Sequence, residues 1–364
     1  MPEIWIPYGN VEALVSVQAE NLGAVAEIPP SGSETDFGRI SELVKGAEAL
    51  FLCDSAPATI ELLRGVIAAV GENTKVYSPA PRKIENSIQE AKGRVATLPP
   101  PVVPVGSDEP TFAPQLLESG PKIFIGTARP DSFFGIVDAK VEACLDWVAR
   151  SQASAAKAMK AMEPQPFQKT DAYDSIEGLA TKIPESRYLT AISRNGRLWT
   201  ALEDPPFDAI KNGFPRVQMP PSRGLIIGAG GKGYDDTLSS TLRGVWSAMG
   251  AVRKLGSVLV VAECSEGAGA TALEAQVTGR TSAEGDRRRE KREGMEEIFY
   301  LSKLKEEYDV LLLSGLPETY ARSKLGFTTA KGSAEAVGRL LNKVGRSGKL
   351  NVIPRAPECL VEAG

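Results

Sequence analysis

Short apolar runs typical of buried strands alternate along this chain with stretches that have the pattern of helices. In the second half the strand-like runs are residues 224–228, 257–262, 309–314 and 349–354. Helical patterns over residues 236–254, 283–308 and 333–344 lie between them. Such a series is typical of a parallel sheet with right-handed crossover connections. The second half therefore predicts an α/β fold with a mainly parallel sheet.

The first half shows the same alternation, interrupted by proline-rich stretches. Its strand-like runs are residues 4–7, 49–53, 74–77 and 122–126, and helical patterns cover residues 54–70 and 140–162. Asn195-Gly196 separates two further apolar runs and suits the type I′ turn of a β-hairpin. Pro220-Pro221 is the preferred domain boundary, and the chain is long enough for two buried cores. We expect two α/β domains, residues 1–220 and 221–364, with mainly parallel sheets and a ligand cleft between them.

No histidine occurs among the 364 residues, and this excludes several kinds of active site. Histidine is the side chain whose ordinary pKa lies near neutrality, and it is the commonest metal ligand. A Ser-His-Asp triad, a Cys-His pair and a histidine zinc site are therefore excluded. Acid–base chemistry in this chain must use carboxylates, lysine, tyrosine or cysteine with a shifted pKa.

Charge and apolar content restrict the partners and the location that we expect. The formal net charge of −4 gives no electrostatic footprint for nucleic acid. The longest apolar runs are too short to span a bilayer, and the first residues lack the features of a signal peptide. The four cysteines lie far apart with no C-x-x-C pair, which disfavours a metal cage. We expect a cytoplasmic protein that binds a small molecule and neither nucleic acid nor membrane.

Residues 228–233 spell G-x-G-x-x-G between a predicted strand and a predicted helix. This pattern is the fingerprint of a dinucleotide-binding turn, in which Gly228, Gly230 and Gly233 let the backbone approach a pyrophosphate. The following helix opens with Asp235 and Asp236, which place negative charge where the pyrophosphate would bind. A tight loop before an acid-capped helix is the alternative interpretation.

Polar side chains follow several predicted strands, at the sheet ends where open α/β proteins bind ligands. Glu263 and Glu266 come directly after the run 257–262 and are candidates for acid–base chemistry. For Glu266 the alternative is a cap on the turn. Asp54 and Arg129 follow strands of the first half and are candidate site residues there.

A lone arginine in the predicted helix 236–254 is a candidate anion-binding group. Arg243 follows Ser239 and Ser240 by about one turn, a spacing that places it to hold a carboxylate.

A second charged stretch predicts a solvated helix and not a binding site. Residues 287–293 look basic, but carboxylates as far as Glu297 interleave them, which is typical of a solvated helix with ion pairs.

Several segments resemble the nickel-dependent lactate racemase family. Residues 6–9 (Ile-Pro-Tyr-Gly) are similar to the end of the family's first strand, and residues 230–235 resemble its G-G-Y-P-x-D segment. Leu242-Arg243-Gly244 resembles its V-K-G, residues 266–269 resemble its D-G-H-G, and residues 351–354 resemble its closing strand. The likeness covers most of the chain and is most specific in the second half.

The resemblance implies two α/β domains around an active site that holds a nickel-pincer nucleotide, attached covalently to a lysine. In the family one histidine holds the nickel, and two others exchange a proton with a 2-hydroxy acid. Lys140 is the nearest match to the cofactor-bearing lysine, and Ser132 stands in place of a catalytic histidine. No histidine is left to hold nickel, so Cys144 is the substitute ligand to consider.

The resemblance also implies which groups of the site are kept. Asp54 matches the aspartate of the family's S-D-H-T-R-P loop, but Ser55, Ala56 and Pro57 stand where its His, Thr and Arg would be. Arg243 replaces a helix lysine that holds substrate or cofactor. The expected substrate-binding residues are Asp54, Ser132, Gly230, Gly231, Asp235, Ser240 and Arg243.

Three functions remain open at this point. The first is a racemase-like protein that binds a small carboxylate or nucleotide-type ligand between its domains without nickel chemistry. The second is an isomerase of 2-hydroxy acids in which Lys140, Glu263 or Glu266 transfers protons. The third is a nicotinamide-dependent oxidoreductase that uses the glycine pattern at residues 228–233.

Overall fold

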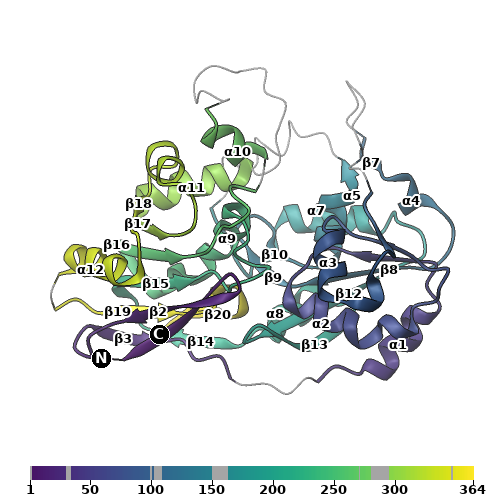
Figure 1. Cartoon of the computed structure of the whole chain (residues 1–364), viewed down its shortest axis with the longest axis horizontal. Coiled ribbons are helices and arrows are strands. Elements are labelled where there is room, and N and C mark those ends of the chain that lie inside the picture. Colours follow the sequence, from purple (N-terminus) through teal and green to yellow (C-terminus); the bar gives the residue numbers. More distant parts are fainter. Residues whose placement is uncertain are drawn as a thin grey trace.

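Two α/β units, each with a six-stranded sheet, lie side by side (Figure 1). The computed structural model describes residues 2–29, 34–98, 101, 109–149, 163–269, 271–279, 295–345 and 347–364. The prediction of an α/β fold with mainly parallel sheets is confirmed. None of the described helices combines the length and the apolar character that a membrane span requires.

The sheet of the first unit has the strand order β13-β12-β8-β4-β5-β6. Neighbouring strands are parallel, except that β12 and β13 form a hairpin. The strands are β4 (Ala49–Leu52), β5 (Lys75–Tyr77), β6 (Val95–Ala96), β8 (Lys122–Thr127), β12 (Ser186–Arg194) and β13 (Arg197–Glu203). The helices are α1 (Phe37–Lys45), α2 (Pro57–Val66), α3 (Pro81–Ser87), α4 (Pro114–Leu117), α5 (Ala139–Trp147), α7 (Asp171–Ala180) and α8 (Phe207–Gly213).

Both faces of this sheet are buried, which explains why β4 and β8 are continuous apolar runs. Phe51 and Phe124 stack on one face, with ring centroids 4.6 Å apart, in a core that α5 and α7 complete. Leu50 and Ile123 face the other side, in a core that α1 and α2 cover. Successive side chains of a strand point to opposite faces, so each strand serves both cores.

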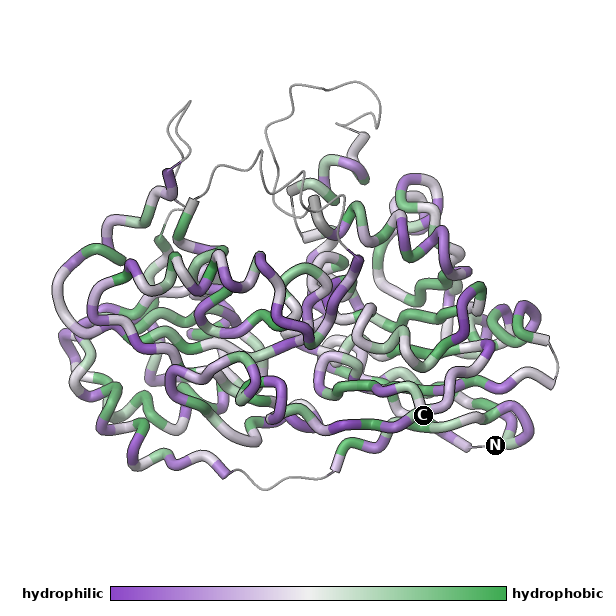
Figure 2. Tube along the Cα trace, turned by 180° about the vertical axis from the view of Figure 1, so that it is seen from behind, coloured by the Kyte–Doolittle hydropathy of each residue, from purple (hydrophilic) through white to green (hydrophobic). Residues whose placement is uncertain are grey.

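The sheet of the second unit has the order β18-β17-β16-β15-β19-β3 and is parallel throughout. Its strands are β3 (Leu22–Val25), β15 (Ser222–Gly228), β16 (Val252–Val261), β17 (Asp309–Leu313), β18 (Thr328–Thr329) and β19 (Leu350–Ile353). Its helices are α9 (Leu238–Val245), α10 (Thr271–Val277), α11 (Met295–Glu307) and α12 (Ser333–Val344). The strands at the centre of each unit are mostly green in Figure 2, in keeping with their burial.

Four two-stranded sheets and five short helical turns lie outside the two six-stranded sheets in the described residues. The two-stranded sheets pair β1 (Glu3–Tyr8) with β2 (Val11–Ser16), β9 (Arg129–Asp131) with β10 (Gly135–Val137), β7 (Thr111–Phe112) with β11 (Val148–Ala149), and β14 (Arg216–Met219) with β20 (Leu360–Ala363). The helical turns are η1 (Ile67–Ala69), η2 (Gln89–Ala91), η3 (Trp246–Ala251), η4 (Thr319–Lys324) and η5 (Ala356–Glu358).

The beginning of the chain packs with the second unit. Strand β3 pairs with β19, and Ile4 and Ile6 of β1 share a core with Ile226 and Leu259 of the second sheet. Figure 1 shows this purple segment beside β19. The domain boundary at Pro220-Pro221, just before β15, stays a prediction. Strands β1 and β3, which precede this boundary in the sequence, pack with the second unit that follows it.

The local turn predictions can be checked directly. Asn195 and Gly196 have φ values of 52° and 74°, as the type I′ turn between β12 and β13 requires. The predicted helix 236–254 is α9 followed by the tight turn η3, and the prediction is wrong for residues 252–254, which begin strand β16. The predicted helices 140–162 and 283–308 are seen as α5 and α11, while residues 150–162 and 280–294 lie outside the described part.

A buried carboxyl group joins the two units at this hairpin. Glu358 of η5 is 0% exposed, and its Oε1 accepts hydrogen bonds from Ser193 Oγ at 2.7 Å and Gly196 N at 2.9 Å. Burial raises the pKa of Glu358 above its ordinary value, and the nearby Arg355 opposes that shift. The contact holds the first sheet against the last turn of the second unit.

This burial predicts how Glu358 contributes to stability as pH changes. Above the ordinary glutamate pKa of 4.5 the unfolded chain loses this proton before the folded chain does. The contribution is therefore fully present below that pH and declines as pH rises through the folded pKa. We expect urea denaturation to show that wild type loses stability relative to Glu358→Gln in this window, by at most about 1.4 kcal/mol per pH unit.

Glu335 provides the matched control, since hydrogen bonds from Lys331 N and Arg339 lower its pKa. For this group the stability contribution is present above the ordinary pKa and is lost as pH falls. The Glu335→Gln comparison should therefore slope in the opposite direction. Equal slopes for both variants would contradict the assignment of Glu358 as a buried carboxyl that resists ionisation.

Candidate functional site

The carboxyl ends of strands from both sheets meet at the junction of the two units. Gly233 follows β15, and a Cβ atom added to it would lie 2.7 Å from the Cα atom of Ala56, which follows β4. Lys83 of α3 forms an ion pair across the same junction with Asp236. The predicted site residues at the ends of β4, β8, β15 and β16 therefore border this junction.

Asp54 holds together the ends of two strands of the first sheet. Its Oδ1 accepts a hydrogen bond from Ala56 N at 2.8 Å, and its Oδ2 accepts one from Thr127 N at 2.6 Å. Both oxygens are thus used by backbone amides next to β4 and β8. The carboxylate fixes the loop that begins α2, and its role as a substrate ligand stays a prediction.

Asp235 connects the β1–β2 turn to the end of a strand of the second sheet. Its Oδ2 accepts hydrogen bonds from Gly9 N at 2.9 Å and Glu263 N at 3.1 Å, so it joins the β1–β2 turn to the end of β16. The residue is 0% exposed, and its Oδ1 has no hydrogen-bond partner among the described residues. Burial raises the pKa of Asp235, and these two amides oppose the shift.

The glycine-rich loop packs against the chain's own backbone. Lys232 N donates to Gly9 O at 2.9 Å, and a Cβ atom on Gly231 would lie 2.8 Å from Pro7 Cβ. A Cβ atom on Gly228 would lie 2.0 Å from Pro354 O. The glycines allow this close packing, and these contacts give no support to the dinucleotide alternative.

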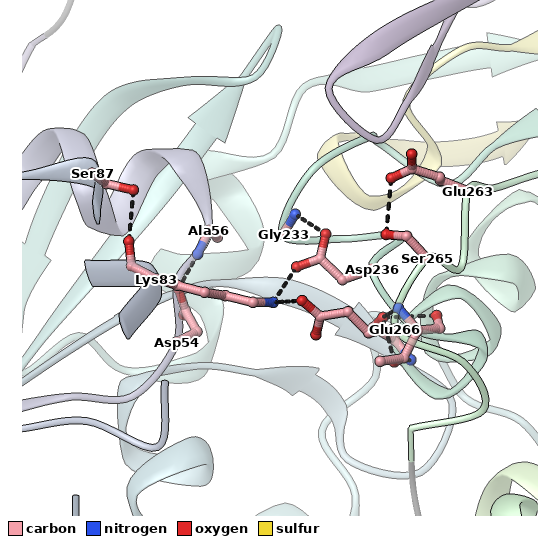
Figure 3. A network of polar contacts seen from close by, with 11 residues as sticks. Asp54, Ala56, Lys83, Ser87, Gly233, Asp236, Glu263, Ser265 and Glu266 are labelled. Atoms are coloured by element: carbon pink, nitrogen blue, oxygen red, sulfur yellow. Dashed lines mark hydrogen bonds and ion pairs between the residues drawn. The ribbon is translucent and has the colours of Figure 1, made fainter. Parts of the chain in front are cut away.

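Lysine 83 forms an ion-pair clamp across the junction, shown in Figure 3. Lys83 Nζ lies 2.7 Å from Asp236 Oδ2 and 2.7 Å from Glu266 Oε1. Glu263 is turned away from this clamp and accepts a hydrogen bond from Ser265 Oγ at 3.0 Å. Sequence reasoning missed Lys83, because nothing in its local pattern marks its partners more than 150 residues away.

The three residues predicted to transfer protons have different partners. Lys140 Nζ lies 3.3 Å from Glu177 Oε1 and 3.3 Å from Pro205 O, both in the first unit. Glu266 belongs to the Lys83 clamp, and Glu263 bonds to its own turn. The described contacts do not bring these groups together, so the isomerase alternative stays a prediction without a shared site.

Arg243 of α9 holds a carboxylate, and this carboxylate belongs to the chain itself. Arg243 Nε lies 3.0 Å from Glu297 Oε1, and Ser239 Oγ donates to the same oxygen at 2.9 Å. The Arg243 side chain is 15% exposed and that of Glu297 is 2% exposed. Glu297 of α11 is ion-paired as expected, but the expectation that it is solvated is wrong, because its side chain is buried.

Ser240 caps α9, and its expected role in binding substrate stays a prediction. Ser240 N donates to Thr237 Oγ1 at 3.1 Å, and Thr237 N donates to Ser240 Oγ at 3.2 Å. This reciprocal arrangement is a capping box. Ser239, one residue earlier and one helical turn from Arg243, is the serine that faces the carboxylate.

A small cavity of about 10 Å³ lies beside Arg243 at the junction. Asp131 and Ser132 of the first unit line it, opposite Arg243 and Glu297 of the second. Ser132 Oγ is buried and has no hydrogen-bond partner among the described residues. A cavity of this size holds one water molecule at most. Two of the predicted substrate-binding residues, Ser132 and Arg243, thus line the same space.

A second buried arginine lies near this cavity. Arg129 of β9 forms an ion pair with Glu142 of α5. Burial lowers the pKa of Arg129, and the positive charge of Arg243 lowers it further. Like charges in a buried region raise each other's free energy unless anions accompany them. Each guanidinium here has a carboxylate of its own.

The residues present do not fit a nickel-pincer nucleotide. The chain has no histidine to hold nickel. Within the described residues no group of three or more Cys, Asp or Glu side chains is arranged to hold a metal ion. Lys140 is engaged by Glu177, and the Cys144 thiol is buried and directed to Ile176 O at 3.9 Å.

The Arg243–Glu297 pair predicts a strongly non-additive effect on stability. Arg243→Met leaves the Glu297 carboxylate buried without its cation, which costs roughly 3–5 kcal/mol. Adding Glu297→Leu should restore most of that loss, because apolar replacement of a whole buried pair is often nearly neutral. Chemical denaturation of the single and double variants measures both quantities.

Exposed arginine Arg322 supplies the control for this cycle. It pairs with Glu318 at 3.5 Å on the surface, with both side chains more than half exposed. Arg322→Met should cost less than about 1 kcal/mol. Additive losses for Arg243→Met and Glu297→Leu would show that the two residues do not stabilise each other.

Comparison with known proteins identifies the fold. No protein-family model matches the chain, and no curated protein matches its sequence. The lactate racemase apoprotein of Thermoanaerobacterium thermosaccharolyticum matches with a TM-score of 0.73 and 15% identity, over 99% of this chain and 100% of that chain. A structural genomics target from Thermotoga maritima matches with a TM-score of 0.58 and 11% identity, over 92% and 100%. At these identities the likeness shows the fold alone: this chain has a lactate-racemase-like fold.

Proposed function

We propose that this protein binds a small carboxylate at Arg243, at the junction of its two units, without nickel-pincer chemistry. The observation that carries the proposal is the convergence of Arg243 Nε and Ser239 Oγ on one carboxylate oxygen. Hydrogen bonds to an ionised partner are stronger than neutral ones, and a buried environment strengthens them further. Arg243 and Ser239 therefore form a carboxylate-binding site, and in this structure the carboxylate is the side chain of Glu297.

A free carboxylate would bind here by replacing the Glu297 side chain. The exchange leaves one anion beside Arg243 in both states, so it does not leave a buried charge without a partner. Ser132 Oγ lies at the same cavity as a further polar group. The fold shared with a lactate racemase apoprotein also favours a small acid as the ligand.

Calorimetric titration of wild type with acetate and propionate tests this function. We expect binding to wild type and a loss of about 10- to 100-fold in affinity for Arg243→Met, because a hydrogen bond to a charged group is removed. Ser239→Ala, which keeps the ion pair, should weaken binding several-fold. The exposed-site variant Arg322→Met should bind as wild type does. Equal affinity in Arg243→Met and wild type would contradict the proposal.

The absence of pincer chemistry has its own test. The full chain is produced together with the enzymes that make the nickel-pincer nucleotide, and its intact mass is measured under denaturing conditions. We expect the unmodified mass, because Lys140 is engaged by Glu177 and the chain lacks histidine. A stable mass increment that disappears in Lys140→Arg would refute this part of the proposal.

A further inference from the structure

The cavity beside Arg243 is polar at one end and apolar over the rest of its wall. Its polar lining consists of Arg243, Glu297, Asp131 and Ser132. The remaining lining is contributed by Phe133 from the first unit and by α9, η3 and α11 from the second: Leu242, Trp246, Tyr300, Leu301 and Leu304. Leu301 and Leu304 are almost fully buried. A ligand carboxylate on Arg243 would therefore place its remaining atoms against aliphatic and aromatic side chains.

An acidic side chain in this wall acts against ligands with a second carboxylate. Burial raises the pKa of this residue, Asp131, and the positive charge of Arg243 opposes that shift. Asp131 lines the cavity, and its Oδ1 accepts hydrogen bonds from Phe133 N at 2.7 Å and Phe134 N at 2.8 Å. Those hydrogen bonds hold the Asp131 side chain in place where the first unit borders the cavity. Arg129, the other cation of this region, is engaged by Glu142 and does not line the cavity. A second anionic group would thus lie beside an acidic side chain, and the cavity lining offers it no cation besides Arg243.

We infer that the ligand class of this site is a short monocarboxylate with an apolar body. Its carboxylate would lie on Arg243 Nε and Ser239 Oγ, and its body against Leu242, Leu301 and Leu304. This inference rests on the proposed function and adds to it the chemistry of the ligand beyond the carboxylate. Lactate and dicarboxylates are then poor ligands, because one lacks the apolar body and the others carry a second charge.

Glu297→Ala is the variant that isolates the site. The substitution removes one methylene and one carboxylate, a group the size of acetate, and leaves Arg243 and Ser239 in place. Acetate, propionate, butyrate and pentanoate are then titrated into Glu297→Ala and into wild type. Affinity for the variant should rise about fourfold with each added methylene until the cavity is filled, because each buried methylene contributes a constant increment.

Two matched pairs of acids separate apolar burial from size alone. Succinate has the chain length of butyrate with a second carboxylate, and 4-hydroxybutyrate has the shape of pentanoate with a terminal hydroxyl. We expect at least tenfold weaker binding for each polar member of a pair. Leu304→Val, which enlarges the cavity wall by one methylene, should move the preferred chain length upward.

The results separate two statements: that the protein binds a carboxylate at Arg243, and that the ligand is a monocarboxylate with an apolar body. If neither wild type nor Glu297→Ala binds any of these acids, the proposed function fails and the inference fails with it. If acetate binds but affinity is flat with chain length, or the polar members bind as tightly as their partners, the function stands and the ligand class is wrong. Rising affinity with length and rejection of succinate support both.

Discussion

A guanidinium group taken out of water must keep an anion beside it, and the junction of this molecule depends on that requirement. Arg243 is nearly buried, and Glu297 of α11 supplies its anion. Arg129, a few residues from the cavity wall at Ser132, relies in the same way on Glu142. Burying either arginine without its carboxylate would cost several kcal/mol, so these pairs hold α11 against α9 and α5 against β9. Each pair lies within one unit and compensates a buried charge on its own side of the junction. The Lys83 clamp and the Glu358 hydrogen bonds are the polar contacts that cross between the units.

Carboxylates that accept backbone amides position the loops around this junction. Asp54 joins the ends of β4 and β8, Asp235 joins the β1–β2 turn to the end of β16, and Glu358 holds the turn of the β12–β13 hairpin. Buried amides left without acceptors would be unfavourable, so each carboxylate fixes the path of its loop. The positions of Ser132 and Arg243 follow from this framework. Their meeting at one cavity is a consequence of the fold more than of local sequence.

The parts of the fold that could be predicted from sequence are those with a local physical cause. The buried strands β4, β8 and β15 are short apolar runs, and the β12–β13 turn needs the positive φ that Asn195-Gly196 provides. The pairing of β3 with β19 was missed, because strands more than 300 residues apart leave no joint pattern. Glu297 was assigned to a solvated helix surface for a similar reason. It is one of many charged residues in its stretch, and only the fold shows that its partner is Arg243. The sequence shows which residues carry ionisable side chains, but the fold determines which of them form buried ion pairs.

A crystal structure of Glu297→Ala grown with butyrate tests most directly that Arg243 is a carboxylate-binding residue. We expect a butyrate carboxylate within about 3 Å of Arg243 Nε and Ser239 Oγ, with its alkyl chain toward Leu301 and Leu304. The variant structure without butyrate should show the same space open or filled by water. A butyrate bound elsewhere, or a space closed by movement of α11 onto Arg243 in the presence of butyrate, would contradict the account.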